Sequence, residues 1–350
     1  MKKLISIIII TFFSLLLIKA QGKKSETLVV NDNQEAELAY NRGIESFYSK
    51  DYKKAITEFT SAISFKKNFY QAYYNRGNTK SEMKDYKSAI SDFNETIRLK
   101  PGYAKAYFGR GVAKINNNES KTAVRDFTKA VTLGKKDAQT YYYRGVAKFL
   151  NENYEGSIAD FTQTIKLKPT DAYAYNDRGS SKKQLEKYDG AVSDYKVAIK
   201  LKPQFPVAYV NMGSAKRKMK DYEGAVADYS TAIKMKPDYY IAYNNRGSAK
   251  FEMKKYDEAE EDYKKTINFN PKYAFAHNNL GSVYMKQKKY KEALQSFNKA
   301  IEINGNYAEA FANRGNAKEM LRDFKGACND WKTAVKLGIK NPKVFTEGCK

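Results

Sequence analysis

Asparagine and aromatic side chains that could bind a partner recur in this sequence every 34 residues. An asparagine amide offers both a donor and an acceptor, which suits the backbone of a bound peptide, and an aromatic ring can pack on apolar side chains or sugar rings. One column of the repeat reads Tyr40, Tyr74, Phe108, Tyr142, Asn176, Val210, Asn244, Asn278 and Ala312, and the next column contains Asn41, Asn75, Asn211, Asn245, Asn279 and Asn313. The chemistry that these residues offer is binding.

Residues suited to catalysis are few. The single histidine, His277, replaces an aromatic residue at a core position, and the sequence offers no Cys–His pairing, no cluster of metal ligands and no glycine-rich phosphate loop. Paired carboxylates such as Asp92 and Glu95 lie on surfaces that repeat along the chain. Nucleophilic, metal-assisted and acid–base catalysis need such groups in fixed arrangements. We therefore predict no catalytic residue, no metal site and no cofactor, and expect that the protein is not an enzyme.

The columns belong to a repeat that predicts paired helices. Nine glycines stand in strict register: Gly43, Gly77, Gly111, Gly145, Gly179, Gly213, Gly247, Gly281 and Gly315. With this glycine numbered as position 8, position 20 is alanine or serine, position 24 is always aromatic, and spacings of three and four mark both halves as amphipathic helices. Small residues at 8 and 20 let two helices approach closely, and the rings fill the adjacent space. We predict nine stacked helix–turn–helix units.

The pattern resembles the tetratricopeptide repeat (TPR), as in AYYNRGNTKSEMKDYKSAISDFNETIRLKP at residues 72–101. The resemblance covers residues 36–339 and implies an all-α fold, a right-handed superhelical solenoid whose first helices line a concave groove. One departure is position 11, usually a large apolar residue in this family, which is lysine in seven repeats: Lys80, Lys114, Lys148, Lys182, Lys216, Lys250 and Lys318. We expect these lysine stems to pack while the ammonium groups reach solvent.

The resemblance also places the binding residues in the groove, because positions 2, 5, 6, 9, 12 and 13 of the first helix tend to face it in this family. A row of asparagines is similar to the ladder that some TPR proteins use to bind an extended peptide. The candidate groove residues are Tyr40, Tyr74, Phe108, Tyr142, Asn176, Asn211, Asn244, Asn245, Asn278, Asn279 and Asn313. The alternative is that these asparagines belong to the NRG pattern that many such repeats carry without a ligand.

Two family features lead to separate expectations. Position 9 changes along the chain, from Ile44, Asn78, Val112 and Val146 to Ser180, Ser214, Ser248, Ser282 and Asn316, so the groove is expected to have an aromatic half and an amide–hydroxyl half.

Some members of the family bind a C-terminal carboxylate with a pattern of lysine, asparagine and arginine residues that extends over three consecutive repeats. No three consecutive repeats of this sequence contain that pattern. Binding of chaperone C-terminal tails is therefore not predicted.

A second repeating pair of charges predicts a stabilising ladder. Position 7 is arginine in seven repeats and position 23 is a carboxylate in eight, and the two positions are nearly level on paired helices. Repeat eight lacks both members, with Leu280 and Ser296. In repeat six Met212 replaces the arginine, so we expect Arg246 of the next repeat to pair with Asp228.

The N-terminal segment predicts export. Lys2 and Lys3 precede an apolar run of about 15 residues that ends near Ala20, which is typical of a signal peptide at residues 1–20 and short of the roughly 20 residues that span a bilayer. The alternative is an uncleaved membrane anchor. No cysteine lies near the cut, so a bacterial lipoprotein anchor is excluded. We expect a flexible lead-in at residues 21–35 and a periplasmic or secreted protein, of bacterial origin.

The formal net charge of +24 favours anionic partners. Lysines recur in the turn at position 15 and before the inter-repeat prolines, so both rims are expected to be positive. The sequence thus predicts an exported scaffold that binds partner proteins or extended peptides, which the basic rims suggest are acidic, in its groove. Two alternatives stay open: a protein held to anionic lipid or polysaccharide at the envelope surface by its rims, and an assembly chaperone for exported proteins. Nucleic acid is not expected, because no nucleic-acid motif is present.

Two cysteines predict a cap on the last repeat. Cys328 stands at position 21 of repeat nine, and Cys349 stands at position 8 of an incomplete tenth unit, in a partial helix and tail at residues 340–350. Antiparallel helices pair position 21 with position 8 of the next helix, so we predict a disulfide; the alternative is two free thiols. A closed loop of about 20 residues would contribute roughly 3 kcal/mol in the chain-entropy model.

We predict that reduction of the mature protein under denaturing conditions raises its mass by two hydrogens, because the Cys328–Cys349 bond accepts them. Intact mass spectrometry before and after reduction measures this change. An unchanged mass would mean two free thiols and no covalent cap.

Overall fold

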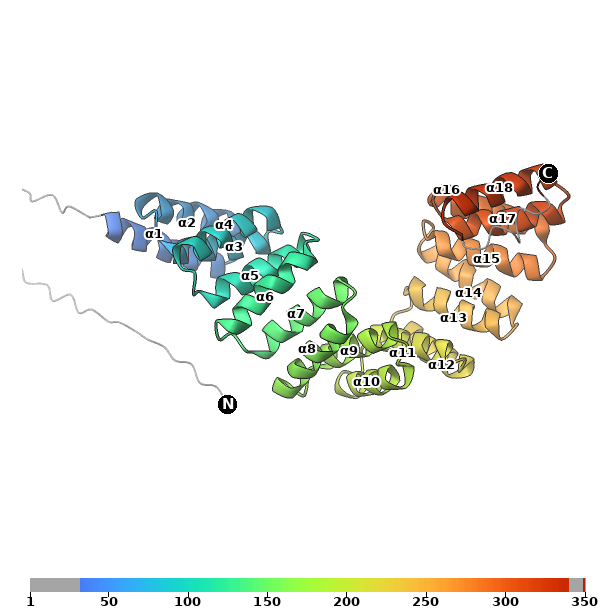
Figure 1. Ribbon diagram of the computed structural model, residues 1–350, viewed down its shortest axis with the longest axis horizontal. Coiled ribbons are helices and arrows are strands. Elements are labelled where there is room, and N and C mark those ends of the chain that lie inside the picture. Colours follow the sequence, from blue (N-terminus) through green and yellow to red (C-terminus); the bar gives the residue numbers. More distant parts are fainter. Residues whose placement is uncertain (1–31, 340–348, 350) are drawn as a thin grey trace, which may run out of the picture.

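In a computed structural model, which describes residues 32–339 and 349, the chain is a curved stack of helix pairs (Figure 1). The described part contains helices and no strand. The helices are α1 (Asp32–Tyr48), α2 (Tyr52–Phe65), α3 (Tyr70–Glu82), α4 (Tyr86–Leu99), α5 (Ala104–Asn116), α6 (Ser120–Thr132), α7 (Ala138–Leu150), α8 (Tyr154–Leu167), α9 (Ala172–Gln184), α10 (Tyr188–Leu201), α11 (Pro206–Lys218), α12 (Tyr222–Met235), α13 (Tyr240–Glu252), α14 (Tyr256–Phe269), α15 (Ala274–Lys286), α16 (Tyr290–Ile303), α17 (Ala308–Met320) and α18 (Phe324–Lys336). Each odd-numbered helix is the first of its repeat, and each even-numbered helix is the second.

The helix boundaries agree with the predicted repeats except at the N-terminal end. Helix α1 begins at Asp32, so the predicted lead-in at 21–35 extends four residues too far. Asp32 and Glu35 lie in the first turn, where their negative charges interact favourably with the helix dipole. The predicted signal peptide at 1–20, residues 21–31 and residues 340–348 of the predicted cap lie outside the described part.

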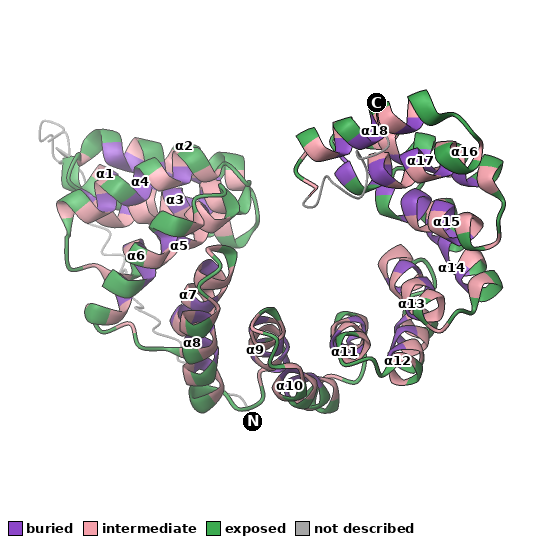
Figure 2. Ribbon diagram, turned by 45° about the vertical axis from the view of Figure 1, so that its right-hand side comes forward, coloured by how far each residue is buried: buried purple, intermediate pink, exposed green. Residues whose placement is uncertain are grey.

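The first helices form the inner layer of the array. Every first helix packs on the second helix of its own repeat and on the first helix of the next repeat, from α1 and α3 to α15 and α17. Second helices make no comparable contact with one another in the described chain. Because neighbours touch on one side and separate on the other, the stack curves; α9, α11 and α13 lie toward the open side of the curve in Figure 2. A groove on this side is therefore lined mainly by odd-numbered helices.

The repeated glycine has a packing cause. A Cβ atom built on Gly281 would lie 2.6 Å from a ring carbon of Phe297, and one on Gly247 would lie 3.0 Å from Tyr263. All nine position-8 glycines face the position-24 aromatic ring of their own repeat in this way. The rings at this position are nearly or completely buried. The glycine thus makes room for the ring, which lies directly on the backbone of the first helix.

The turn inside each repeat adopts a left-handed conformation at position 15. The nine residues there have φ between 58° and 64°, and none is glycine: Lys50, Lys84, Asn118, Glu152, Glu186, Lys220, Lys254, Lys288 and Arg322. This conformation costs a side-chain-bearing residue roughly 1–2 kcal/mol. Hydrogen bonds of the turn offset that cost, as where the amide of Asp85 donates to the carbonyl of Lys80 at 2.9 Å. The Asp85 carboxylate then caps α4 by accepting from the amide of Ser88.

The arginine–carboxylate ladder is present, and lysine completes it. In repeat two, Arg76 donates Nε and Nη2 to the two oxygens of Asp92 at 2.9 and 2.7 Å, and Lys80 Nζ lies 2.7 Å from Asp92 Oδ2. The expectation that the position-11 ammonium groups reach solvent is wrong for all seven lysines: Lys80, Lys114, Lys148, Lys182, Lys216, Lys250 and Lys318. The position-23 aspartates are buried, so a second cation offsets more of the desolvation penalty than the arginine alone.

Repeat six is the weak point of this ladder. The predicted pairing of Arg246 with Asp228 is wrong, because Arg246 donates to Asp262 and Ser230. Asp228 keeps one cation, Lys216, whose Nζ lies 2.8 Å from Oδ2 without hydrogen-bond geometry. Burial, the largest cause, raises the pKa of Asp228 above its ordinary value. The carboxylate is thus less well neutralised where Met212 replaces arginine.

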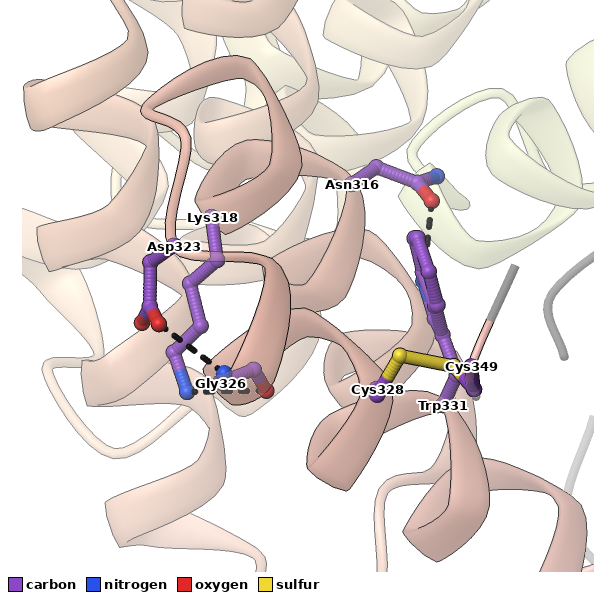
Figure 3. Close-up of a disulfide and its surroundings, with 7 residues drawn as sticks. All are labelled: Asn316, Lys318, Asp323, Gly326, Cys328, Trp331 and Cys349. Carbon is purple, nitrogen blue, oxygen red and sulfur yellow. Dashed lines mark hydrogen bonds between the residues drawn. A yellow bond between two sulfur atoms is a disulfide. The ribbon is translucent and has the colours of Figure 1, made fainter.

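A disulfide joins the last described helix to residue 349. The sulfur atoms of Cys328 and Cys349 are bonded, with 5.5 Å between the Cα atoms, which is the pairing expected from the repeat register (Figure 3). On the same helix, Trp331 donates from Nε1 to Asn316 Oδ1 at 3.1 Å. The bond therefore holds residue 349 against α18.

We predict that Gly281→Ala destabilises the protein by about 1–3 kcal/mol, because its new methyl group collides with the Phe297 ring and overpacks the repeat. Gly305→Ala is the matched control: a Cβ there meets nothing within 4 Å, so its effect should stay within about 1 kcal/mol and be neutral or stabilising. Urea unfolding measures both. Equal effects of the two changes would contradict the proposed role of the repeated glycine.

Candidate functional site

Cavities recur along the inner face at equivalent positions of the repeat. One of about 190 Å³ lies between α1 and α3, one of about 290 Å³ involves α7, α9 and α11, and one of about 430 Å³ involves α13, α15 and α17. Each is lined by position-9, position-12 and position-24 residues of one repeat and by position-6 residues of the next, such as Ile44, Phe47, Phe59 and Asn75 in the first cavity. The repeat itself therefore generates a row of hollows in one groove.

The predicted aromatic half of the groove is also part of the core. Tyr40, Tyr74, Phe108 and Tyr142 are half-buried, and each packs on the position-24 phenylalanine of its repeat at 5.6–5.9 Å between ring centroids. None of the four is fully exposed to the groove. The four rings therefore belong to the packed core, and none of them lines the three cavities described above.

The predicted asparagines pair between repeats. Asn211, Asn279 and Asn313 donate from Nδ2 to Oδ1 of Asn176, Asn244 and Asn278, at 3.0, 3.1 and 2.9 Å respectively. The three acceptors at position 5 are 5–6% exposed, so a ligand meets the position-6 residues. Asn245, at position 6, is half-buried and accepts a long hydrogen bond of 3.4 Å from Asn244. The asparagine columns thus link successive first helices, and their contact with a peptide stays a prediction.

In repeats five to seven the serine at position 9 is a hydrogen-bond partner of the tyrosine at position 24. Tyr195, Tyr229 and Tyr263 donate their hydroxyl groups to Ser180, Ser214 and Ser248, each at 3.2 Å. Burial raises the pKa of all three phenols, that of Tyr263 to about 12. Repeats one to four have phenylalanine at position 24 and need no such partner. The hydroxyl half of the groove is therefore largely a consequence of core hydrogen bonding.

One groove residue that the sequence analysis passed over is a carboxylate. Asp177 stands at position 6, where six other repeats have asparagine, and it lines the cavity of about 290 Å³ beside Val146, Phe161 and Val207. It accepts hydrogen bonds from Tyr142 Oη at 2.7 Å and Asn176 Nδ2 at 2.9 Å. Burial, the largest cause, raises the pKa of Asp177. Among residues 32–339 and 349 it forms no ion pair.

Three cations that the sequence analysis also missed line a separate cavity of about 350 Å³. They are Lys183 at position 12 of repeat five, and Arg217 and Lys218 at positions 12 and 13 of repeat six. Position 12 is apolar in five other repeats: Phe47, Ile115, Phe149, Phe251 and Met285. Alignment of the nine repeats by column would have revealed both Asp177 and these cations.

The rims are less uniform than expected. The basic position-15 residues are exposed, but the position-11 lysines face inward and add no charge to that edge. At the opposite edge, Lys100 lies 4.3 Å from the ring centroid of Tyr70, and Lys202 lies 4.4 Å from that of Tyr173. These lysines interact with aromatic faces while their charges stay near the surface.

The histidine makes a structural contact in the described chain. His277 is buried, with Nε2 3.0 Å from the carbonyl oxygen of Pro271, which is a structural contact. Within residues 32–339 and 349 there is no group of three His, Cys, Asp or Glu side chains arranged to hold a metal ion. No helix in those ranges has the length and apolar character needed to cross a bilayer.

Comparisons with known proteins agree with the helical repeat. Two models described as "Tetratricopeptide repeat" match residues 274–307 and residues 70–103 and 172–205, and one described as "TPR repeat" matches residues 213–254 and 247–288. A search of curated proteins returned no match.

Solved structures resemble the chain in fold. The APC/C hetero-tetramer Cut9–Hcn1 is 16% identical with a TM-score of 0.57, covering 81% of this chain and 55% of that one. YrrB, a TPR protein described as having an unusual peptide-binding site, is 23% identical with a TM-score of 0.47, covering 53% of this chain and 95% of that one. MamA is 23% identical with a TM-score of 0.45, covering 48% and 92%.

We predict that Asp177→Asn stabilises the protein at pH 7. Burial raises the folded-state pKa of Asp177 above its ordinary value of 3.8, so stability present at low pH is lost as pH rises through the folded-state pKa. Asparagine does not ionise, so the variant does not lose this stability at pH 7. Its amide can donate a hydrogen bond to the Tyr142 hydroxyl, as the Asn75 amide donates to the Tyr40 hydroxyl at 2.7 Å. The advantage over the unmodified protein should shrink as pH falls toward about 4, as measured by urea unfolding.

Asp194→Asn is the matched control for this change. Asp194 is also buried but pairs with Arg178 and Lys182, so its neutralisation should destabilise the protein at pH 7 by leaving two cations without their carboxylate. Lower stability of Asp177→Asn at pH 7 would mean that the Asp177 charge is needed by the fold.

Proposed function

Since the chain belongs to the tetratricopeptide repeat family, we propose that it is an exported scaffold that binds a partner polypeptide in the groove formed by its first helices. The TPR scaffold is consistent with protein or peptide binding, and proteins of this family are typically not enzymes. Beyond what the family implies, we propose that binding occurs in the groove, that the protein is exported and that its partner is a polypeptide.

The row of equivalent cavities on the inner face is the main support for binding in the groove. Each hollow combines apolar walls with a few polar groups, as where Phe251, Met285 and Met320 meet Asn313 in the cavity beside α17. Such composition is typical of binding sites, since apolar walls supply contact area and polar groups fix orientation. Because the hollows repeat along one groove, an extended segment can occupy several of them at once, with one side chain in each.

Export is supported by the cysteine chemistry. Disulfides persist in oxidising compartments and are rare in reducing ones. The bond between Cys328 and Cys349 therefore fits a protein that the N-terminal apolar run directs out of the cytoplasm.

A second candidate function is attachment to an anionic surface through the basic rims. The exposed lysines and arginine at position 15 favour it, since six of the nine turns carry a cation: Lys50, Lys84, Lys220, Lys254, Lys288 and Arg322. Charges exposed to solvent are screened by salt within about 10 Å at 0.1 M. Rim binding should therefore collapse at high salt, whereas binding in a largely apolar groove should persist.

We predict that placing two carboxylates in the groove abolishes partner capture. Val207 and Met320 line two of the cavities and are 42% and 50% exposed, so Val207→Glu with Met320→Glu should leave the fold intact. Cross-linking pull-down of the mature protein should then lose its specific partners by about tenfold or more, because a charge would be buried in the interface.

The matched control carries the same charges on second helices. Leu167 and Leu201 are 46% and 39% exposed at the ends of α8 and α10, and Leu167→Glu with Leu201→Glu should retain all partners. The pull-down is repeated at high salt. Partners that survive the groove change but disappear at high salt would support rim binding; weak capture of many unfolded proteins would support a chaperone.

A further inference from the structure

We propose that the cavity formed by Lys183, Arg217 and Lys218 binds the side-chain carboxylate of an acidic residue in the partner polypeptide. This inference rests on the proposed function and names the chemistry of one subsite in the groove. The lining residues come from α9, α11 and the start of α10. These helices lie near the middle of the array in Figure 2.

The three cations have no counter-ion in the described protein. Gln184, Glu186, Tyr188 and Ser214 complete the lining of the cavity, and Glu186 is the one carboxylate among these lining residues. No ion pair within 4.0 Å joins Lys183, Arg217 or Lys218 to any residue in the ranges 32–339 and 349. Elsewhere on the first helices, the position-11 lysines are paired with buried aspartates. The three cations therefore differ from the position-11 lysines of the same helices, which are paired.

A buried donor in the cluster also lacks a partner. The Nε atom of Arg217 is inaccessible to solvent and has no hydrogen-bond acceptor in the described protein, while the guanidinium also interacts with the Tyr229 hydroxyl and lowers the pKa of that phenol against the larger effect of burial. Buried donors are almost always satisfied in folded proteins, so an exception calls for an explanation. A carboxylate in the cavity would supply an anion for this guanidinium, because its two oxygens match the planar N–H groups of arginine.

Like charges make the free cavity unfavourable. Burial, the largest cause, lowers the pKa of Lys183, and the charges of Arg217 and Lys218 lower it further. An anion in the cavity would reverse the effect of these neighbours by neutralising them. Packing does not require the cations, since position 12 holds phenylalanine, isoleucine or methionine in five other repeats.

The position of the cavity favours a polypeptide as the source of the carboxylate. Ser180 and Asn211 line the neighbouring cavity, and Lys183 and Ser214 follow them by three residues on α9 and α11, which is about one helical turn. A single extended segment can therefore place one side chain in each cavity. These cations stand at positions 12 and 13, so the subsite differs from the terminal-carboxylate pattern that the sequence lacks.

The test uses a random library of peptides about 12 residues long, displayed and selected on the mature protein. Acidic residues should be enriched at one position among the bound peptides, and Lys183→Met with Arg217→Met should remove that enrichment. A selected peptide is then synthesised with an amidated C-terminus, in glutamate and glutamine forms. The glutamate form should bind the unmodified protein about tenfold or more tightly than the glutamine form, and the two forms should bind K183M/R217M equally.

The matched control removes the same charge from the outer layer of the same repeats. Lys200 and Lys234 are exposed on α10 and α12, and K200M/K234M should keep the glutamate preference. The thermal midpoint of K183M/R217M should rise, because like-charge repulsion and the unsatisfied donor are removed. A lower midpoint would assign the cations a structural role and overturn the proposal.

Different results would contradict the proposed subsite and the proposed function of the groove. Bound peptides with no acidic preference, or an acidic preference that persists in K183M/R217M, would overturn the subsite and leave the groove function standing. Absence of any bound peptide would overturn both.

Discussion

The structure depends on one close contact in each repeat, between the glycine of the first helix and the aromatic ring of the second. The ring of Phe297 lies so near Gly281 that even a methyl group would not fit. This contact sets how closely the two helices approach, and it recurs nine times, so each repeat presents the same outline to the next. The regular spacing of the inner helices, and with it the row of cavities, follows from this repeated contact.

Polar groups are arranged around that contact with few exceptions. Aspartates buried beside the aromatic rings receive two hydrogen bonds from arginine and an ion pair from lysine, as at Asp92. Tyrosines at position 24 receive a serine partner where phenylalanine needs none. Buried side-chain atoms without a hydrogen-bond partner remain in the described chain at Ser81, Arg217, Asp228 and Gln287, and two of these four residues belong to repeat six. Each such atom costs stability, and Arg217 also lines a cavity of the groove.

The groove residues carry two roles at once, which limits how a partner can use them. Asn244 and Asn278 are needed to bind the asparagines of the following repeat, so their amides are already engaged. A bound polypeptide would instead meet the position-6 amides, the apolar walls and the charged centre.

The helix pairs, the register of nine repeats and most of the arginine–aspartate ladder could be predicted from the sequence, because they follow from a strict period and from which positions are level on paired helices. The same register favoured pairing of Cys328 with Cys349 but left two free thiols open, and it failed at Asp228. The directions of the polar side chains could not be predicted from the sequence, because they depend on the tertiary structure. Lys80 turns toward Asp92 instead of solvent, and Asn244 is buried against Asn279. The position of a residue in the repeat predicts which face of the helix it occupies. The rotamer of its side chain depends on which groups of a neighbouring helix can pair with it, because such a partner lowers the free-energy cost of burying a polar group.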